Sequence, residues 1–154
     1  MEEARSKYRE YLQFCKDQEQ VYHQMAAGLG VSDSVLSLLF TLWEEGDGLT
    51  PTQLYGEWSL SKQTGHSALM WLEERGLVRL VPGKGDRRSK TVYLTGRGRE
   101  YARGRVAPLL EAERNAFDAL DGEEQRTLVA LLGKMVKSLK EETEGLAKAP
   151  DQFL

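Results

Sequence analysis

Apolar side chains recur at helical intervals near the start of the chain. Between residues 3 and 27 they fall three, four or seven positions apart, the spacing of one face of an α-helix. The positions are Tyr8, Leu12, Cys15, Tyr22 and Met25. We predict one long amphipathic helix here, ended by Gly28 and Gly30.

The next segment is apolar on nearly every side. Between residues 35 and 43 only a serine and a threonine interrupt the apolar run Val35, Leu36, Leu38, Leu39, Phe40, Leu42 and Trp43. Such a helix belongs in the centre of a domain, because no face of it favours water. Ser32 or Ser34 can cap its N-terminus, and the sequence Gly46-Asp47-Gly48 ends it.

Two short helices with a tight turn are predicted next. Thr50, Pro51 and Gln53 form a strong helix start, with a capping threonine, proline in the first turn and a glutamine that closes a capping box. This helix runs to about Trp58, and Ser61 can cap another that ends before Gly76. The pair is a helix-turn-helix unit.

The remaining pattern predicts a hairpin followed by two more helical segments. Residues 77–81 and 91–94 are rich in β-formers and flank the turn-forming residues 82–86. Thr95 caps a helix that Pro108 must kink or interrupt. Asp121 and Glu124 form a capping box before a last helix, whose apolar stripe is Leu128, Leu131, Leu132, Met135 and Leu139. The fold class is therefore mainly α with a small β-hairpin wing (α+β), a winged helix-turn-helix with extra helices at both ends.

Charge is unevenly distributed along the chain. The net charge is only −3, but residues 75–105 hold ten lysines and arginines against Asp86 and Glu100. A segregated basic stretch is the footprint expected of a protein that neutralises nucleic-acid phosphates. A basic face exposed to solvent without a partner is the alternative interpretation.

Other classes of protein find little support. The lone Cys15 excludes an internal disulfide, and two distant histidines suggest neither a metal site nor any other cofactor. His23 and His66 have no partners at catalytic spacing, so we do not expect an enzyme. The apolar runs are too short for a membrane span, and we expect a cytoplasmic protein without a membrane partner.

The second helix of the helix-turn-helix has one polar, acid-free face. At 100° per residue, Lys62, Gln63, His66, Ser67 and Met70 point outward, while Ser61, Thr64, Gly65, Ala68, Leu72 and the stem of Arg75 point inward. Glutamine, lysine, serine and histidine can read base edges or hold phosphates in a major groove. An ordinary amphipathic surface helix is the alternative. Gly65 inside the helix suggests close approach by a neighbouring helix.

Residues 49–98 resemble the MarR family of transcriptional regulators. The matching motifs, in order, are Ser59-Leu60-Ser61-Lys62-Gln63-Thr64, Leu72-Glu73-Glu74-Arg75-Gly76-Leu77-Val78, Asp86-Arg87-Arg88-Ser89 and Val92-Tyr93-Leu94-Thr95-Gly96-Arg97-Gly98. The last two fit the family's D-x-R wing and L-T-x-x-G helix start. The helices outside this segment match only in number and length.

The resemblance implies a homodimer that binds double-stranded DNA at a pseudopalindromic operator, as a repressor. Residues 1–30 and 99–145 would then be dimerisation helices, 31–98 the DNA-binding domain and 146–154 a polar tail. The implied recognition-helix residues are Ser61, Lys62, Gln63, Thr64, His66 and Ser67. In the wing, Arg88 would enter the minor groove, Asp86 would hold the tip, and Lys84, Arg87 and Lys90 would contact phosphates.

The resemblance also implies release of DNA by a small aromatic or amphipathic effector. The candidate ligand-binding residues are Tyr11, Phe14, Cys15, Trp43, Trp58 and Trp71, although aromatic residues at helical spacing also fill cores. One branch of the family senses peroxides through a first-helix cysteine, so a thiol-based redox sensor using Cys15 is one alternative. A winged-helix module that binds proteins instead of DNA is another.

Overall fold

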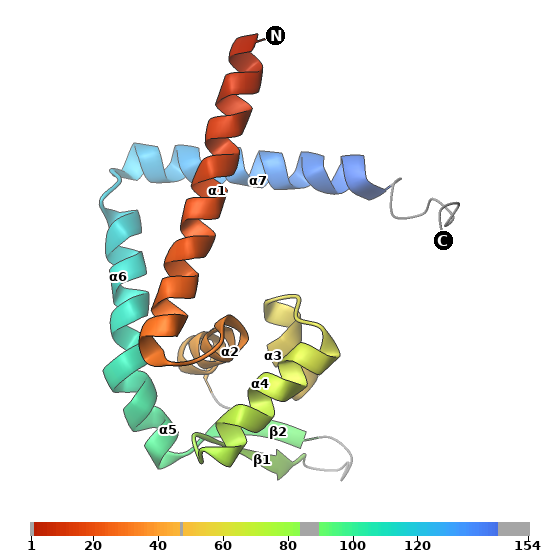
Figure 1. Cartoon of the computed structure of the whole chain (residues 1–154), viewed down its shortest axis with the longest axis vertical. Coiled ribbons are helices and arrows are strands. Elements are labelled where there is room, and N and C mark those ends of the chain that lie inside the picture. The colour runs from red at the N-terminus through yellow and green to blue at the C-terminus, as the bar shows by residue number, and fades with distance from the viewer. Residues whose placement is uncertain (1, 47, 84–89, 145–154) are drawn as a thin grey trace. The chain divides into compact units, whose positions relative to one another are not determined.

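The computed structural model describes residues 2–46, 48–83 and 90–144, which form helices and an antiparallel hairpin (Figure 1). The chain divides between Glu111 and Ala112 into two compact units. The elements, in order, are α1 (Glu2–Leu29), α2 (Asp33–Glu44), α3 (Pro51–Glu57), α4 (Lys62–Glu74), β1 (Val78–Pro82), β2 (Lys90–Leu94), α5 (Gly96–Tyr101), the π-helical segment η1 (Ala102–Val106), α6 (Ala107–Asp118) and α7 (Gly122–Glu144).

Helix α2 is the core of the first unit, as its composition predicts. Seven of its 12 residues are buried, and it packs against α1, α3, α4 and η1. Leu38, Leu39 and Leu42 are at most 1% exposed. The buried hydroxyl of Thr41 accepts a hydrogen bond from Trp58 Nε1 at 2.8 Å, so its burial leaves no unpaired polar group.

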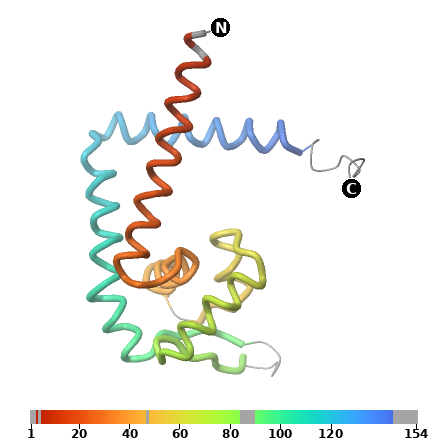
Figure 2. Tube along the Cα trace, in the orientation of Figure 1, coloured from red at the N-terminus to blue at the C-terminus, as the bar shows by residue number. Residues whose placement is uncertain are grey.

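The chain turns sharply between α1 and α2 (Figure 2). Gly30 has a φ of +68°, and Ser32, rather than Ser34, caps α2 by accepting from the Val35 N–H at 3.3 Å. His23 Nδ1 on α1 lies 3.0 Å from Asp33 Oδ1 on α2. Within the described residues no single helix is long and apolar enough to cross a membrane; only α1 and α2 together, bent by 88°, reach that length and composition.

The predicted interruption near Pro108 is confirmed. Thr95 caps α5 by accepting from the Gly98 N–H at 2.9 Å. The π-helical segment η1 follows, and the Ala107 N–H bonds back to the carbonyl of Ala102. Because proline has no N–H and crowds the carbonyl four residues earlier, the wider π-turn lets the chain continue into α6.

Helix α7 begins at the predicted capping box. Asp121 accepts from the N–H groups of Glu123 and Glu124, and the Asp121 N–H donates to Glu124 Oε2. No residue of α7 is buried. Its apolar side chains stand exposed by 38% at Leu128, 61% at Leu131 and 59% at Leu139.

Candidate nucleic-acid interface

The turn between α3 and α4 has a defined geometry. Thr50 and Gln53 form the predicted capping box at the start of α3. At its end, Ser59 adopts a φ of +50°, and the N–H groups of Ser59 and Leu60 donate to the carbonyls of Gly56 and Tyr55. This is the Schellman arrangement, here with serine in the left-handed position that usually favours glycine. It fixes the angle at which α4 leaves α3.

Gly65 allows α3 and α4 to pack closely, as predicted. A Cβ atom at this position would collide with Cγ and Cδ1 of the buried Tyr55 ring and lie 2.8 Å from its Cε1. The ring therefore occupies the space that any larger residue at position 65 would need. Burial of Tyr55 also raises the pKa of its phenol.

The exposed face of α4 carries hydroxyl, amide, imidazole and ammonium groups. The proposed recognition residues Ser61, Lys62, Gln63, Thr64, His66 and Ser67 are all exposed, and no acidic residue occurs before Glu73. The inward face consists of Gly65, Ala68, Leu69 and Leu72.

Part of the predicted inward face was wrong. Ser61, Thr64 and Arg75 are exposed. Leu69, which was assigned to neither face at 100° per residue, is buried. Ser61 is the N-cap, so its hydroxyl turns back to the helix end and lies 2.8 Å from Thr64 Oγ1. Arg75 is the C-cap, and its guanidinium stacks 3.8 Å above the Trp71 ring. Residues at the two ends of a helix bond to unpaired backbone groups, so the burial of their side chains does not follow the 100° spacing of the middle.

The hairpin joins the helix-turn-helix through Leu49 as well as through α4. Val78 pairs with Leu94 and Pro82 with Lys90. Leu49, just before α3, forms an additional bridge to Val92. The wing is therefore tied to the start of α3. The wing-tip candidates Lys84, Asp86, Arg87 and Arg88 lie outside the described residues, whereas Lys90 is exposed at the start of β2.

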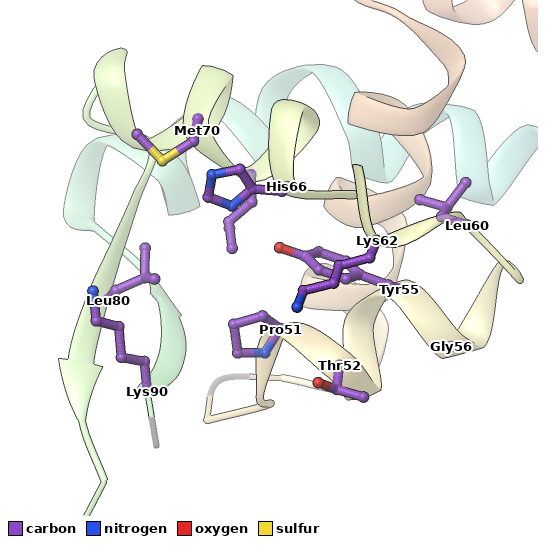
Figure 3. A pocket seen from close by; sticks show the side chains of 11 residues that line it. Pro51, Thr52, Tyr55, Gly56, Leu60, Lys62, His66, Met70, Leu80 and Lys90 are labelled. Carbon is purple, nitrogen blue, oxygen red and sulfur yellow. The ribbon is translucent and has the colours of Figure 1, made fainter. Parts of the chain in front are cut away.

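A groove of about 560 Å³ lies between α3, α4 and the hairpin (Figure 3). Its walls include Pro51 and Tyr55 of α3, Leu69 of α4 and Leu80 of β1. In Figure 3 the Tyr55 hydroxyl points into the groove. Its basic lining residues are Lys62, His66 and Lys90. The sequence does not predict this groove, because α3, α4, β1 and β2 enclose it only after they pack together.

The basic stretch of residues 75–105 is divided by the fold. Arg79 lies on β1, its guanidinium 5.4 Å from the Tyr93 ring centroid. Four further exposed arginines belong to α5 and η1, namely Arg97, Arg99, Arg103 and Arg105. One continuous run of charge in the sequence is thus divided among the end of α4, the two strands of the hairpin, α5 and η1.

The candidate ligand residues do not form one cluster. Tyr11, Phe14 and Cys15 lie in the first half of α1, where Phe14 is 62% exposed. Trp43 and Trp71 are half-buried and pack against the core of the first unit. Trp58 ends α3 and is 45% exposed.

Cys15 has an aromatic neighbour on its own helix. It is half-buried, and its side chain hydrogen-bonds to the Tyr11 hydroxyl, which raises the pKa of Tyr11. Tyr11 also stacks on Tyr8 with ring centroids 6.2 Å apart. Among the residues that the structure places, no group of three or more histidines, cysteines and carboxylates could hold a metal ion.

Comparisons with known proteins identify the domain. The model of the MarR family matches residues 29–89. The transcriptional regulator PecS of Dickeya dadantii is 34% identical over 104 residues, which cover 66% of this chain and 63% of PecS. The aligned segment thus spans less than two thirds of that relative.

Solved structures show the same fold. The MarR family regulator NMB1585 from Neisseria meningitidis superposes with a TM-score of 0.76 over 90% of this chain and 97% of its own, at 22% identity. MepR from S. aureus in complex with DNA superposes with a TM-score of 0.69 over 86% of this chain and 97% of its own, also at 22% identity. The predicted fold class, a winged helix-turn-helix, is confirmed, and the predicted resemblance to the MarR family is confirmed over residues 29–89.

Proposed function

We propose that this chain is a transcriptional repressor that binds operator DNA as a homodimer. The observation that carries the proposal is the exposed, acid-free face of α4 beside the hairpin of a MarR-family domain. A protein-binding module without DNA affinity would instead present acids or large apolar side chains on this face.

In the proposed complex α4 occupies a major groove and the hairpin reaches the adjacent minor groove. Gln63 and Lys62 stand on the first turn of α4, where side chains of a recognition helix contact base edges. Their proposed partners are adenine for the amide and guanine for the ammonium. Arg88 remains the proposed minor-groove arginine, from the family resemblance.

The proposed dimer covers the apolar surfaces that the single chain leaves exposed. These are the stripe on α7 and, on α1, Tyr8 and Phe14, each about 60% exposed. Contiguous apolar patches of this kind mark protein interfaces. A twofold dimer would present two α4 helices to half-sites about one helical turn apart, which gives a pseudopalindromic operator.

The dimer is tested by a charge placed on or off the stripe. Leu131→Glu puts a carboxylate within it, whereas Ala130→Glu puts one on the opposite, exposed side of α7. We expect Leu131→Glu to be a monomer or to unfold, and Ala130→Glu to remain a dimer in sedimentation analysis. A monomeric wild-type chain at micromolar concentration would contradict the proposal.

DNA binding is tested by selecting duplexes from a random pool with the purified protein. We expect recovery of an inverted repeat. Gln63→Ala should weaken binding to that repeat by about 1–3 kcal/mol and relax its sequence preference. Lys62→Ala and Arg88→Ala should also weaken binding, whereas Lys7→Ala, which removes an exposed lysine on α1, should not. Recovery of no common sequence, or equal binding by all variants, would refute the proposal.

We further propose that a small amphipathic effector releases the operator. Its support is that the first unit contains cavities next to the helix-turn-helix. A ligand shifts DNA affinity only if it binds the free and bound conformations unequally.

A further inference from the structure

A second cavity lies where α1, α2 and the end of α3 meet. Its volume is about 270 Å³, and none of its lining residues is shared with the groove of Figure 3. The residues that line it are Glu19, Tyr22, Asp33, Leu36, Ser37, Phe40 and Trp58. We call it the acidic pocket. It lies entirely within the first compact unit.

Aromatic rings form several sides of the acidic pocket. The centroids of Phe40 and Trp58 are 6.5 Å apart with their planes tilted by 48°. Although Trp58 is 45% exposed, its indole N–H is held by Thr41 Oγ1, which in turn donates to the Ser37 carbonyl. The ring is therefore an anchored wall. Such walls suit a planar ligand and attract a cation through their π faces.

The charges around the acidic pocket are carboxylates. Glu19 on α1 and Asp33 on α2 line it, and none of the described residues that line it is a lysine or arginine. Outside the pocket, the imidazole of His23 faces Asp33 at 3.0 Å, and both side chains are exposed. The polarity is opposite to that of the groove beside α4, where Lys62, His66 and Lys90 are found.

The acidic pocket is connected to the turn of the helix-turn-helix. Trp58 is the C-cap of α3, and Ser59, the residue in the left-handed conformation, follows it directly. A molecule in the pocket would therefore contact α1, the core helix α2 and the last residue before the turn. Filling the pocket would favour one arrangement of the turn over others, which is how a ligand biases a conformational equilibrium.

We infer that the acidic pocket binds a small aromatic amine in its cationic form, and that this class of molecule is the effector of the chain. The inference rests on the proposed function, since an effector requires DNA binding to regulate. The ring lies against Phe40 and Trp58, and the ammonium lies between Glu19 and Asp33. A volume of about 270 Å³ admits one ring with a short side chain.

The test uses three probes of similar size and different charge, namely benzylammonium, benzyl alcohol and benzoate. Each is titrated into the DNA-free protein while the indole N–H resonances are followed by NMR, and Trp58→Phe identifies the resonance of Trp58. We expect benzylammonium to shift that resonance at concentrations at least about fivefold lower than benzyl alcohol, with benzoate weakest. Glu19→Gln should reduce the ratio between the benzyl alcohol and benzylammonium concentrations by about fivefold. Glu10 is an exposed carboxylate on the same helix, away from the pocket, and Glu10→Gln should leave this ratio unchanged.

The outcomes separate this inference from the proposed function. Equal titration by the three probes, or the same result for Glu19→Gln and Glu10→Gln, overturns the assignment of ligand class even if the protein binds DNA. Failure to bind any duplex without probes overturns the proposed function, while the titration still decides the pocket. An operator affinity that stays unchanged at saturating benzylammonium overturns the effector role.

Discussion

Replacement of Gly65 by alanine tests whether contact between α3 and α4 positions the proposed recognition helix, α4. On an open helix surface this change stabilises a protein by about 1 kcal/mol, because alanine loses less entropy on folding. At position 65 the new methyl group would meet the Tyr55 ring, with Cε1 at 2.8 Å and two other ring atoms closer. Tyr55 is only 9% exposed, so a shift of its ring would disturb the residues packed around it. Overpacking of this kind costs about 1–3 kcal/mol.

We place Gly65→Ala near the upper end of that range, since the contacted atoms belong to a buried ring. After the gain in helix propensity, the net loss is about 2 kcal/mol. Gly56→Ala is the matched control, because a Cβ atom there meets nothing within 4 Å. It should stabilise by about 0.5–1 kcal/mol. Opposite signs for one chemical change would identify the contact, not the residue type, as the cause.

Urea unfolding at one fixed protein concentration measures the stability of both variants, since the stability of the proposed dimer would depend on concentration. Duplex affinity should fall for Gly65→Ala as α4 moves away from α3. In a Tyr55→Leu background the cost of the alanine should shrink, which is the coupling expected of residues in contact. If Gly65→Ala were as stable as Gly56→Ala, the close packing of the two helices would be refuted.

Three further outcomes follow from local geometry. Ser59→Gly should raise the free energy of unfolding by about 1 kcal/mol, because glycine has no penalty at a φ of +50°; no change in the urea midpoint would contradict the assigned turn. The backbone N–H groups of Glu124 and Glu123 lower the pKa of Asp121. The stabilisation from this cap should therefore be complete above the ordinary carboxyl pKa and be lost as the pH falls through the lowered pKa of Asp121. Asp121→Ala should remove this loss of stability at acid pH, measured as the thermal midpoint against pH. Cys15→Ser should bind DNA in peroxide just as the wild-type chain does, because the thiol is half-buried; a peroxide response that is lost in this variant would instead support the redox alternative.

Local signals in the sequence predicted the boundaries of the helices well. Thr50, Thr95 and Asp121 each cap the helix that they were expected to cap. A cap involves atoms of three or four consecutive residues, so its energy depends on neighbours in the chain alone. The identity of Gly65 as a contact point was also predictable, because a glycine inside a helix is unfavourable unless something occupies the space of a side chain.

The cavities could not be predicted because their residues meet only in the folded chain. Trp58 illustrates this limit. Its partner Thr41 lies 17 positions earlier, inside a helix whose composition indicates only burial. The sequence shows an aromatic residue at the end of α3. It does not show that the indole N–H donates to Thr41 or that the ring lines a pocket. The Leu49 bridge to β2 escapes prediction for the same reason.

The basic stretch shows how folding changes the meaning of a charge count. Phosphate neutralisation depends on how many cations reach one DNA surface, because each released counterion contributes separately to affinity. Of the ten basic residues between positions 75 and 105, four belong to α5 and η1 and not to α4 or the hairpin. Arg75 and Arg79 are further engaged with the rings of Trp71 and Tyr93. The number of lysines and arginines in this stretch is therefore an upper limit on the phosphates that its side chains could contact in one subunit. The particular residues on α4 and the hairpin support DNA binding more strongly than the total charge does.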